Sequence, residues 1–268
     1  MDLHLSGRTA LVTGASKGIG LAVVSTLLDE GARVVAVSRR TSPELEKLAR
    51  PGLVHVPADL MDHDSPARVV ARTVEEFGGL DVLVNNAGGP PPGVSLPRTS
   101  FLDADDPDWS AIFEFNLFSA VRTVRAALPH LLADGGGAVV TVSTALARQP
   151  SVGNAEYGAA KSALNHLTKV LSEEYAPRGV RFNTVSPGAV RTAWWTEEGG
   201  AADVIAAMAG SDRDTVMDTL APQMMNMSTG RLVTPQEVAD AVALLASPRS
   251  GSTTGADLVV DGGYLKAA

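Results

Sequence analysis

Short apolar runs rich in β-branched residues alternate along the chain with longer stretches whose apolar positions recur at helical spacing. The short runs predict strands at residues 8–13, 33–38, 53–57, 81–84, 137–143, 180–185 and 257–260. The longer stretches predict helices near residues 18–30, 43–49, 65–77, 108–133, 155–176 and 235–246. Strands joined by crossover helices lie parallel in one sheet. The pattern therefore predicts an α/β fold, a doubly wound parallel sheet of about seven strands with helices on both faces.

Two segments depart from this alternation. Residues 88–93 are rich in glycine and proline, and residues 193–230 lack a clear period while carrying two tryptophans and five methionines. A long segment without a pattern is usually functional or weakly ordered, and methionine adapts to irregular apolar shapes. We expect 193–230 to form a lobe that covers a substrate; packing on the core or on a neighbouring subunit is the alternative. No shift of composition marks a second domain, so we expect residues 1–268 to form one.

Composition and charge narrow the classes of function. The chain carries 22 basic and 30 acidic residues for a net charge of −8, and its basic residues are scattered, which disfavours nucleic acid as a partner. It has no cysteine, and its five histidines show no ligand spacing, so we expect no metal site. Its start lacks a basic-then-apolar leader, and no stretch approaches the roughly 18 apolar residues of a membrane span. We expect a soluble, cytoplasmic protein without a membrane partner.

A glycine-rich turn follows the first predicted strand and opens the first predicted helix. Glycines at such a turn let backbone N–H groups approach a pyrophosphate at the positive end of a helix. Position makes the motif specific, because the strand comes directly before the turn and an amphipathic stretch directly after it. The turn predicts a Rossmann-type dinucleotide site made by Gly14, Ser16, Lys17, Gly18, Ile19 and Gly20.

The end of the second predicted strand indicates which dinucleotide binds. A site for NAD usually places a carboxylate there for the ribose 2′-hydroxyl, whereas a 2′-phosphate requires guanidinium and hydroxyl donors. This chain offers Ser38, Arg39 and Arg40, with Lys17 in the adjacent turn and no acid. We therefore expect NADP(H) as the cofactor; the alternative is that the arginines are solvated loop charges and cofactor choice is loose.

Tyr157 and Lys161 lie four residues apart in a strongly helical stretch, which places a phenol and an ammonium on one helix face. Reduction of a carbonyl by hydride needs a donor that protonates the developing alkoxide. A phenol titrates near about 10, and a nearby ammonium lowers its pKa by favouring the phenolate. We expect Lys161 to tune Tyr157 in this way.

Three motifs occur in a fixed order and together carry a family resemblance. They are Gly14-x-x-x-Gly18-x-Gly20, Asn85-Asn86-Ala87-Gly88 and Tyr157-x-x-x-Lys161. From about residue 5 to 264 the chain resembles the short-chain dehydrogenase/reductase family, in its single-domain NADP(H) branch, which includes members like 3-oxoacyl-(acyl-carrier-protein) reductase. The resemblance implies a single-domain oxidoreductase that forms a homotetramer or a homodimer, with the last strand at an interface.

The resemblance also implies roles for individual residues. Asp59 and Leu60 match the pair that contacts adenine, and Asn116 matches an asparagine that relays protons through water. Lys161 would also bind the nicotinamide ribose beside Tyr157. The remaining cofactor residues lie at the nicotinamide side, the carboxamide and the phosphates: Asn86, Ala87, Gly88, Pro187, Gly188, Val190 and Thr192.

One further hydroxyl should orient the substrate carbonyl. Family members commonly carry a serine thirteen residues before the tyrosine, and this position holds Thr144, with Ser143 one place earlier. Adjacent residues that leave a strand point in opposite directions, so only one of them can take the role. We expect Thr144; an insertion in the following loop would give the role to Ser143.

These observations predict reversible hydride transfer between NADP(H) and a small-molecule ketone or secondary alcohol. A specific 3-oxoacyl-(acyl-carrier-protein) reductase is one alternative, although the acidic carrier would have only Arg122, Arg125 and Arg178 to contact. A catalytically silent dinucleotide sensor is the other alternative. Such a protein typically lacks the Tyr–Lys pair, which this chain has.

Overall fold

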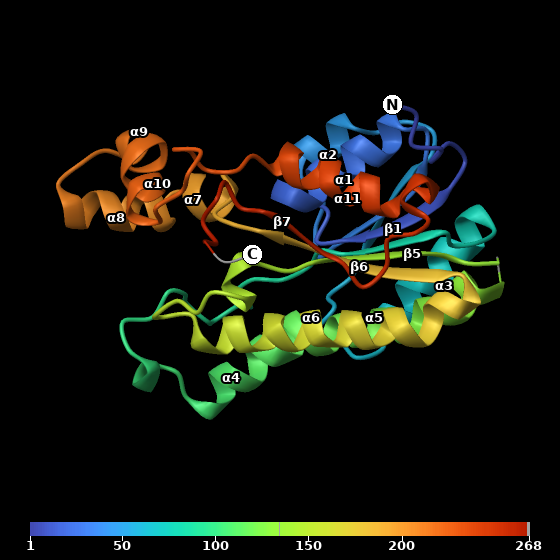
Figure 1. Cartoon of the computed structure of the whole chain (residues 1–268), viewed down its shortest axis with the longest axis horizontal. Coiled ribbons are helices and arrows are strands. Elements are labelled where there is room, and N and C mark those ends of the chain that lie inside the picture. The colour runs from blue at the N-terminus through green and yellow to red at the C-terminus, as the bar shows by residue number, and fades with distance from the viewer. Residues whose placement is uncertain (134, 267–268) are drawn as a thin grey trace.

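Seven parallel strands form one sheet in the order β3-β2-β1-β4-β5-β6-β7 (Figure 1). The computed structural model describes residues 1–133 and 135–266. The strands are β1 (Thr9–Thr13), β2 (Arg33–Ser38), β3 (Leu53–Pro57), β4 (Val82–Asn85), β5 (Gly137–Val142), β6 (Val180–Pro187) and β7 (Asp257–Val260). The predicted α/β fold class with a doubly wound parallel sheet is confirmed, and the predicted strands lie where the β-branched runs are.

Helices cover both faces of the sheet (Figure 1). One layer holds α1 (Gly18–Asp29), α2 (Pro43–Lys47) and α11 (Pro235–Ala246), and the other holds α3 (Ser65–Phe77), α5 (Ser119–Ala133) and α6 (Ala155–Tyr175). Alternate strand residues face opposite layers, so Val12 and Val34 pack in one apolar core while Leu11 and Val35 pack in the other. A sheet buried on both faces explains why its strands read as continuous apolar runs.

The strand order reverses between β1 and β4, the two strands at the centre of the sheet. In open α/β sheets a ligand binds at such a switch point, outside the carboxyl ends of the strands. The loops that follow β1 and β4 meet there, because a Cβ atom added to Gly14 would lie 2.9 Å from the Cα atom of Ala87.

The single helix predicted at 108–133 is wrong in one respect. The structure divides it into α4 (Asp106–Phe113), a π-helical turn (Glu114–Phe118) and α5. The side chain of Asn116, in the π turn, donates to the carbonyl of Ile112 at 3.0 Å and also binds Gly89, which lies on another loop. Single π turns inside helices are frequently found at functional sites.

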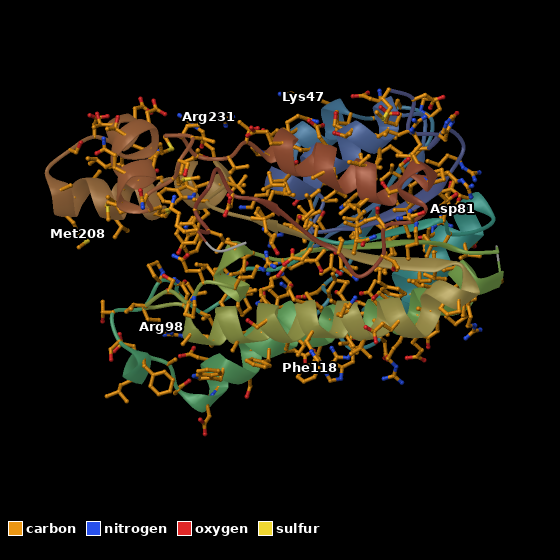
Figure 2. All side chains as sticks on the ribbon, viewed as in Figure 1. Lys47, Asp81, Arg98, Phe118, Met208 and Arg231 are labelled. Carbon is orange, nitrogen blue, oxygen red and sulfur yellow. The ribbon has the colours of Figure 1, made fainter. Side chains whose placement is uncertain are left out.

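A helical lobe extends from one end of the molecule between β6 and α11 (Figure 1). Its helices are α7 (Ala193–Thr196), α8 (Ala201–Ala209), α9 (Arg213–Thr215), a π turn (Val216–Leu220) and α10 (Ala221–Met224), where the sequence showed no period. Trp195 and Met217 are buried and anchor the lobe on the core. Met208 is 85% exposed and lies at the outer tip of the lobe (Figure 2).

Within the described parts of the chain, every helix falls short of the length and apolar character that a membrane span requires.

Candidate active site

The glycine turn has the backbone that a dinucleotide site requires. Gly14 and Gly18 have φ of 66° and 58°, in the left-handed region that glycine adopts without strain. A Cβ atom on Gly20 would lie 2.2 Å from the carbonyl oxygen of Gly14, so the helix starts in direct contact with the turn. The first residues of α1 receive no side-chain cap from Lys17, which leaves their N–H groups free for an anion.

Neighbouring backbone contacts fix the shape of this turn. The N–H of Ala15 donates to the carbonyl of Val37 at 3.0 Å, which holds the turn against β2. The hydroxyl of Ser42 donates to the carbonyl of Ser16 at 2.6 Å and also caps α2. Ile19 is half-buried and packs on the apolar core. The predicted turn residues are therefore together in space.

The loop after β4 is bound directly to the glycine turn. The side-chain amide of Asn86 donates to the carbonyls of Thr13 at 2.9 Å and Gly14 at 3.1 Å. The hydroxyl of Thr13 accepts from the N–H groups of Asn86 and Ala87, each at 3.0 Å. Sequence reasoning missed Thr13; its polar side chain at the end of an otherwise apolar strand, directly before the first glycine, was the available signal.

The residues expected near a 2′-phosphate lie at the end of β2. The guanidinium groups of Arg39 and Arg40 are exposed, and within residues 1–133 and 135–266 neither forms an ion pair. The hydroxyl of Ser38 donates to the carbonyl of Arg40 at 2.8 Å and lies 2.9 Å from Nε2 of His55, a neighbour that the sequence did not single out. Burial lowers the pKa of His55 below its ordinary value.

Lys17, also expected there, has another partner. Its Nζ lies 2.8 Å from a carboxylate oxygen of Glu197 in the lobe, and both side chains are well exposed. Asp59 and Leu60 follow β3; the carboxylate of Asp59 accepts from the N–H of Met61 at 3.0 Å, and Leu60 is buried.

The segment after β6 closes against the glycine turn from the other side. A Cβ atom on Gly18 would lie 3.2 Å from Cγ2 of Thr192, and one on Gly188 would lie 2.8 Å from the Cα atom of Asp261. Pro187 is the last residue of β6, and Val190 forms an isolated parallel bridge with Val233. The structure thus places Thr192 beside the glycine turn, whereas Gly188 contacts Asp261 and Val190 pairs with Val233.

Tyr157 and Lys161 lie on the first turns of α6. Nζ of Lys161 is buried, 5.9 Å from the centre of the Tyr157 ring, and donates to the carbonyl of Val142 at 3.0 Å. A Cβ atom on Gly88 would lie 2.8 Å from Nζ of Lys161 and 2.9 Å from Oδ1 of Asn116. Gly88 is therefore the point where the loop after β4, the π turn that carries Asn116, and α6 meet.

Burial sets the protonation of this pair. It raises the pKa of Tyr157 to about 12 and lowers the pKa of Lys161 to about 8. The shift of Tyr157 is opposite in direction to the expectation from sequence, because removal from water outweighs the attraction of an ammonium that faces the ring rather than the hydroxyl. At neutral pH the phenol keeps its proton, and most of the Lys161 side chains remain charged.

Asn116 is buried and its side chain is well satisfied. Its Oδ1 accepts from the N–H of Gly89 at 2.8 Å, and its Nδ2 donates to the carbonyls of Gly89 at 2.9 Å and Ile112 at 3.0 Å. One lone pair of Oδ1 is left for a water molecule. The relay role stays a prediction; the structural role, joining the π turn to Gly89, is visible.

The two candidate hydroxyls differ in their hydrogen bonds. Oγ of Ser143 is fully buried and has no hydrogen-bond partner among the described residues. Oγ1 of Thr144 accepts from the N–H of Leu146 at 3.3 Å, which leaves its own proton to donate. Ser143 and Thr144 are both buried, at 4% and 8% exposure, so Thr144 stays the expected residue on its spacing from Tyr157.

A doubly wound sheet with a glycine turn at its switch point, and with a partly buried tyrosine and a buried lysine on one helix beside it, is the arrangement of a nicotinamide-dependent oxidoreductase. A family model described as enoyl-(acyl carrier protein) reductase matches residues 14–265. The chain belongs to the short-chain dehydrogenase/reductase family, and the predicted membership is confirmed. Its family acts on the CH–OH/C=O pair by hydride transfer.

Individual relatives are similar to this chain over nearly its full length. It is 36% identical over 261 residues to cis-4-hydroxycyclohexanecarboxylate dehydrogenase of Sinomonas cyclohexanicum, covering 96% of each chain. It is 34% identical over 265 residues to 3-oxoacyl-(acyl-carrier-protein) reductase of Vibrio cholerae, covering 97% of this chain and 98% of the relative. Among solved structures, L-sorbose reductase of Gluconobacter frateurii in complex with NADPH and L-sorbose has a TM-score of 0.89 at 29% identity, covering 100% of both chains.

Proposed function

We propose that the protein transfers a hydride between NADP(H) and a ketone or secondary alcohol, with Tyr157 as the general acid and base. The observation that carries the proposal is that Lys161 and Asn116 both lie next to Gly88. Gly88 follows Ala87, whose N–H binds Thr13 directly before the glycine turn. This places a proton donor beside the site where a nicotinamide would lie.

The residues of the turn fit a dinucleotide. Gly14, Gly18 and Gly20 leave open the space that side chains would fill, and the N-terminus of α1 offers unpaired N–H groups to a pyrophosphate. Asn86, Ala87 and Gly88 would border the nicotinamide. When bound, the nicotinamide supplies the hydride in reduction and accepts it in oxidation.

The chain's own residues then control the proton. In reduction a C–H bond forms at the carbonyl carbon, the C=O π bond breaks, and the oxygen takes the proton of Tyr157. The hydroxyl of Thr144 donates to the same oxygen and orients it. The ammonium of Lys161 stabilises the phenolate that remains, and a water on Asn116 returns a proton. Because burial raises the pKa of Tyr157 to about 12, the phenol carries its proton at neutral pH, which is the form that a general acid in reduction requires.

A ketone panel with NADPH tests this proposal. Tyr157→Phe removes the proton donor without changing the shape of the site, so turnover should fall by about 10²–10⁴-fold while the Kd for NADPH stays within about twofold. Tyr175→Phe is the matched control, because Tyr175 packs on Phe182 at the far end of α6. Retained turnover in Tyr157→Phe would sink the mechanism. Tight NADPH binding without turnover of any ketone by the wild-type protein would favour the sensor.

Preference for NADP(H) over NAD(H) is part of the proposal. The exposed guanidinium groups of Arg39 and Arg40 support it, whereas Lys17 is already paired with Glu197. A hydrogen bond to a charged group is worth about 1.5–3 kcal/mol, so Arg39→Ala should weaken NADPH about 10–100-fold and leave NADH nearly unchanged. Arg249→Ala, an exposed arginine in another part of the surface, is the control. Equal losses for both cofactors would contradict the preference.

A free small molecule fits this site better than a carrier-bound substrate. Of the three arginines that an acidic carrier would contact, Arg122 is bound to Glu114 and Arg178 stacks on Tyr175 with 5.6 Å between its guanidinium carbon and the ring centre. Only Arg125 remains unpaired among the described residues. We place the substrate between the loop that follows Gly88 and the 193–230 lobe, which would cover it.

Self-association completes the proposal. β7 is one of the two edge strands of the sheet, β3 being the other, and its Leu258 is 38% exposed. An uncovered edge strand with an exposed apolar side chain is open to pairing with a second copy. We propose a homotetramer or a homodimer, which light scattering would distinguish from a monomer.

A further inference from the structure

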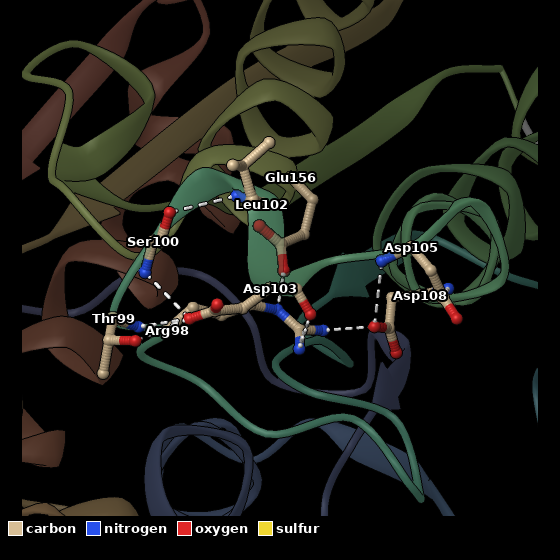
Figure 3. Close-up of polar contacts among 8 residues, drawn as sticks. All are labelled: Arg98, Thr99, Ser100, Leu102, Asp103, Asp105, Asp108 and Glu156. Atoms are coloured by element: carbon tan, nitrogen blue, oxygen red, sulfur yellow. Dashed lines mark hydrogen bonds and ion pairs between the residues drawn. The ribbon is translucent and has the colours of Figure 1, made fainter.

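A partly buried arginine binds a buried glutamate, the residue directly before the proposed catalytic tyrosine. Nε of Arg98 lies 2.8 Å from Oε1 of Glu156, and Glu156 is 2% exposed while the Arg98 side chain is 13% exposed. Glu156 is the second residue of α6, and Tyr157 is the third. Figure 3 shows the guanidinium of Arg98 between Glu156 and the start of α4.

The planar guanidinium of Arg98 contacts three segments: the start of α6, the turn at Asp103 and the start of α4. Besides Glu156, its guanidinium donates to the carbonyl of Asp103 at 3.1 Å and pairs with the carboxylate of Asp108 at 2.9 Å. Asp108 in turn caps α4 through a reciprocal bond with Asp105. A planar guanidinium offers five donors in a fixed fork, so these three contacts set the relative positions of the three segments.

The turn that carries Arg98 contains hydrogen bonds of its own. The carboxylate of Asp103 accepts from the hydroxyl of Thr99 at 2.6 Å and from the N–H of Ser100 at 2.8 Å (Figure 3). These bonds, with the one from the Thr99 hydroxyl contributing most, hold the pKa of Asp103 below its usual value. Arg98 therefore contacts α6 from a turn that is held by its own hydrogen bonds.

Before Lys161, the ion pair with Arg98 is the side-chain contact that holds the first turn of α6 among the described residues. Its N-cap residue, Asn154, makes no side-chain cap. The hydroxyl of Tyr157 has no hydrogen-bond partner among the described residues, so the backbone alone places the phenol. Just before the helix, the N–H of Arg98 donates to the carbonyl of Gly153 at 2.8 Å, and a Cβ atom on Gly153 would lie 2.3 Å from the carbonyl oxygen of Arg98.

We propose that Arg98, through Glu156, is a positioning residue for Tyr157: it fixes the first turn of α6 so that the phenol stays aligned with the substrate carbonyl. A buried ion pair adds little net stability compared with apolar packing, and its contribution is often to a defined geometry. This inference rests on the proposed function, since it assumes that Tyr157 transfers the proton.

Three variants separate positioning from stability. Arg98→Met removes the fork, Arg98→Lys keeps the charge without the fork, and Glu156→Gln keeps the shape without the charge. We expect Arg98→Met to lower kcat about 10–100-fold, since a displacement near 1 Å can cost about 10²-fold. The KM for ketone should change by less than about threefold and the Kd for NADPH by less than about twofold, with Arg98→Lys intermediate. The double variant Arg98→Met/Glu156→Gln should lose no more than the worse single variant.

The control is Arg8→Met, which breaks a pair whose two side chains are 47% and 20% exposed at the opposite end of the sheet. Nη1 of Arg8 lies 2.5 Å from Oδ1 of Asp81, which Figure 2 shows far from Arg98. This variant should lower Tm without lowering kcat. If Arg98→Met resembles it, or changes KM alone, the positioning role is overturned. If Arg98→Met does not fold, Arg98→Lys and Glu156→Gln decide by the same criteria.

A second measurement does not depend on turnover. Hydrogen exchange of the backbone amides at residues 155–161 should be faster in Arg98→Met than in Arg8→Met, because the first turn of α6 opens more readily. Unchanged exchange there would overturn the inference even if no ketone is turned over. Failure of the proposed function appears separately, as absent wild-type turnover or as retained turnover in Tyr157→Phe.

Discussion

Gly88→Ala places one methyl group against the ammonium of Lys161. Its new Cβ would lie 2.8 Å from Nζ of Lys161 and 2.9 Å from Oδ1 of Asn116, where ordinary contact begins at 3.4 Å. The groups must separate by 3.4 − 2.8 = 0.6 Å and 3.4 − 2.9 = 0.5 Å. Asn116 is held by three hydrogen bonds, so the ammonium of Lys161 is the group that moves, at the expense of its bond to Val142.

The expected cost falls on catalysis more than on folding. Loss of one hydrogen bond costs about 1 kcal/mol, which for a chain of this size lowers Tm by about 2–4 °C. A shift of roughly half an ångström to one ångström at a reacting group can cost about 10–100-fold in rate. Gly88 does not have a positive φ, so alanine adds no backbone strain that would confuse the result.

Gly158→Ala is the matched control, because Gly158 adjoins Tyr157 and has room. A Cβ atom there meets only the carbonyl oxygen of Leu146, at 3.4 Å. Alanine within a helix is more favourable than glycine by about 1 kcal/mol, so this variant should be at least as stable as the wild type with kcat within about twofold. Steady-state kinetics and NADPH titration check both variants. Near-normal kcat in Gly88→Ala, or a loss confined to NADPH affinity, would refute the reasoning about Lys161.

Two further predictions concern the same site. Lys161, whose pKa burial lowers to about 8, loses its charge above that pH, so kcat/KM for ketone reduction should be level near neutrality and fall above about pH 8; a steady rise to about pH 10 in a pH–rate profile would contradict this. Thr144→Ala removes a donor to the developing alkoxide and should lower kcat about 10²-fold, whereas Ser143→Ala, which removes a buried hydroxyl without a partner, should leave kcat within about threefold; kinetics that reverse this order would assign the role to Ser143.

The strands could be predicted from the sequence because a buried strand shows itself as a short run of mostly apolar residues. An apolar run such as 34–37 reflects burial on both faces of the sheet, which affects neighbouring residues alike. The glycine turn and the Tyr–Lys spacing could be found for the same reason: each is a short-range requirement of a turn or a helix face.

Features that depend on distant contacts could not be found in this way. The π turn that interrupts the predicted helix is associated with a bond between Asn116 and Gly89, 27 residues away. The ion pair of Arg98 with Glu156 joins residues 58 apart, and neither stood out from ordinary surface charges in the sequence. The raised pKa of Tyr157 follows from burial, which spacing alone cannot supply.

The loop after β4 and the 193–230 lobe are joined to the rest of the site by contacts of different burial. The loop after β4 is bound at its start by Thr13 and further along by Arg98, both through partly or fully buried contacts. The lobe contacts the glycine turn through the exposed Lys17–Glu197 pair, and exposed pairs contribute little, about 0–1 kcal/mol. The groups that would transfer the proton are therefore held by buried contacts, whereas the ion pair that joins the lobe to the glycine turn is exposed and weak.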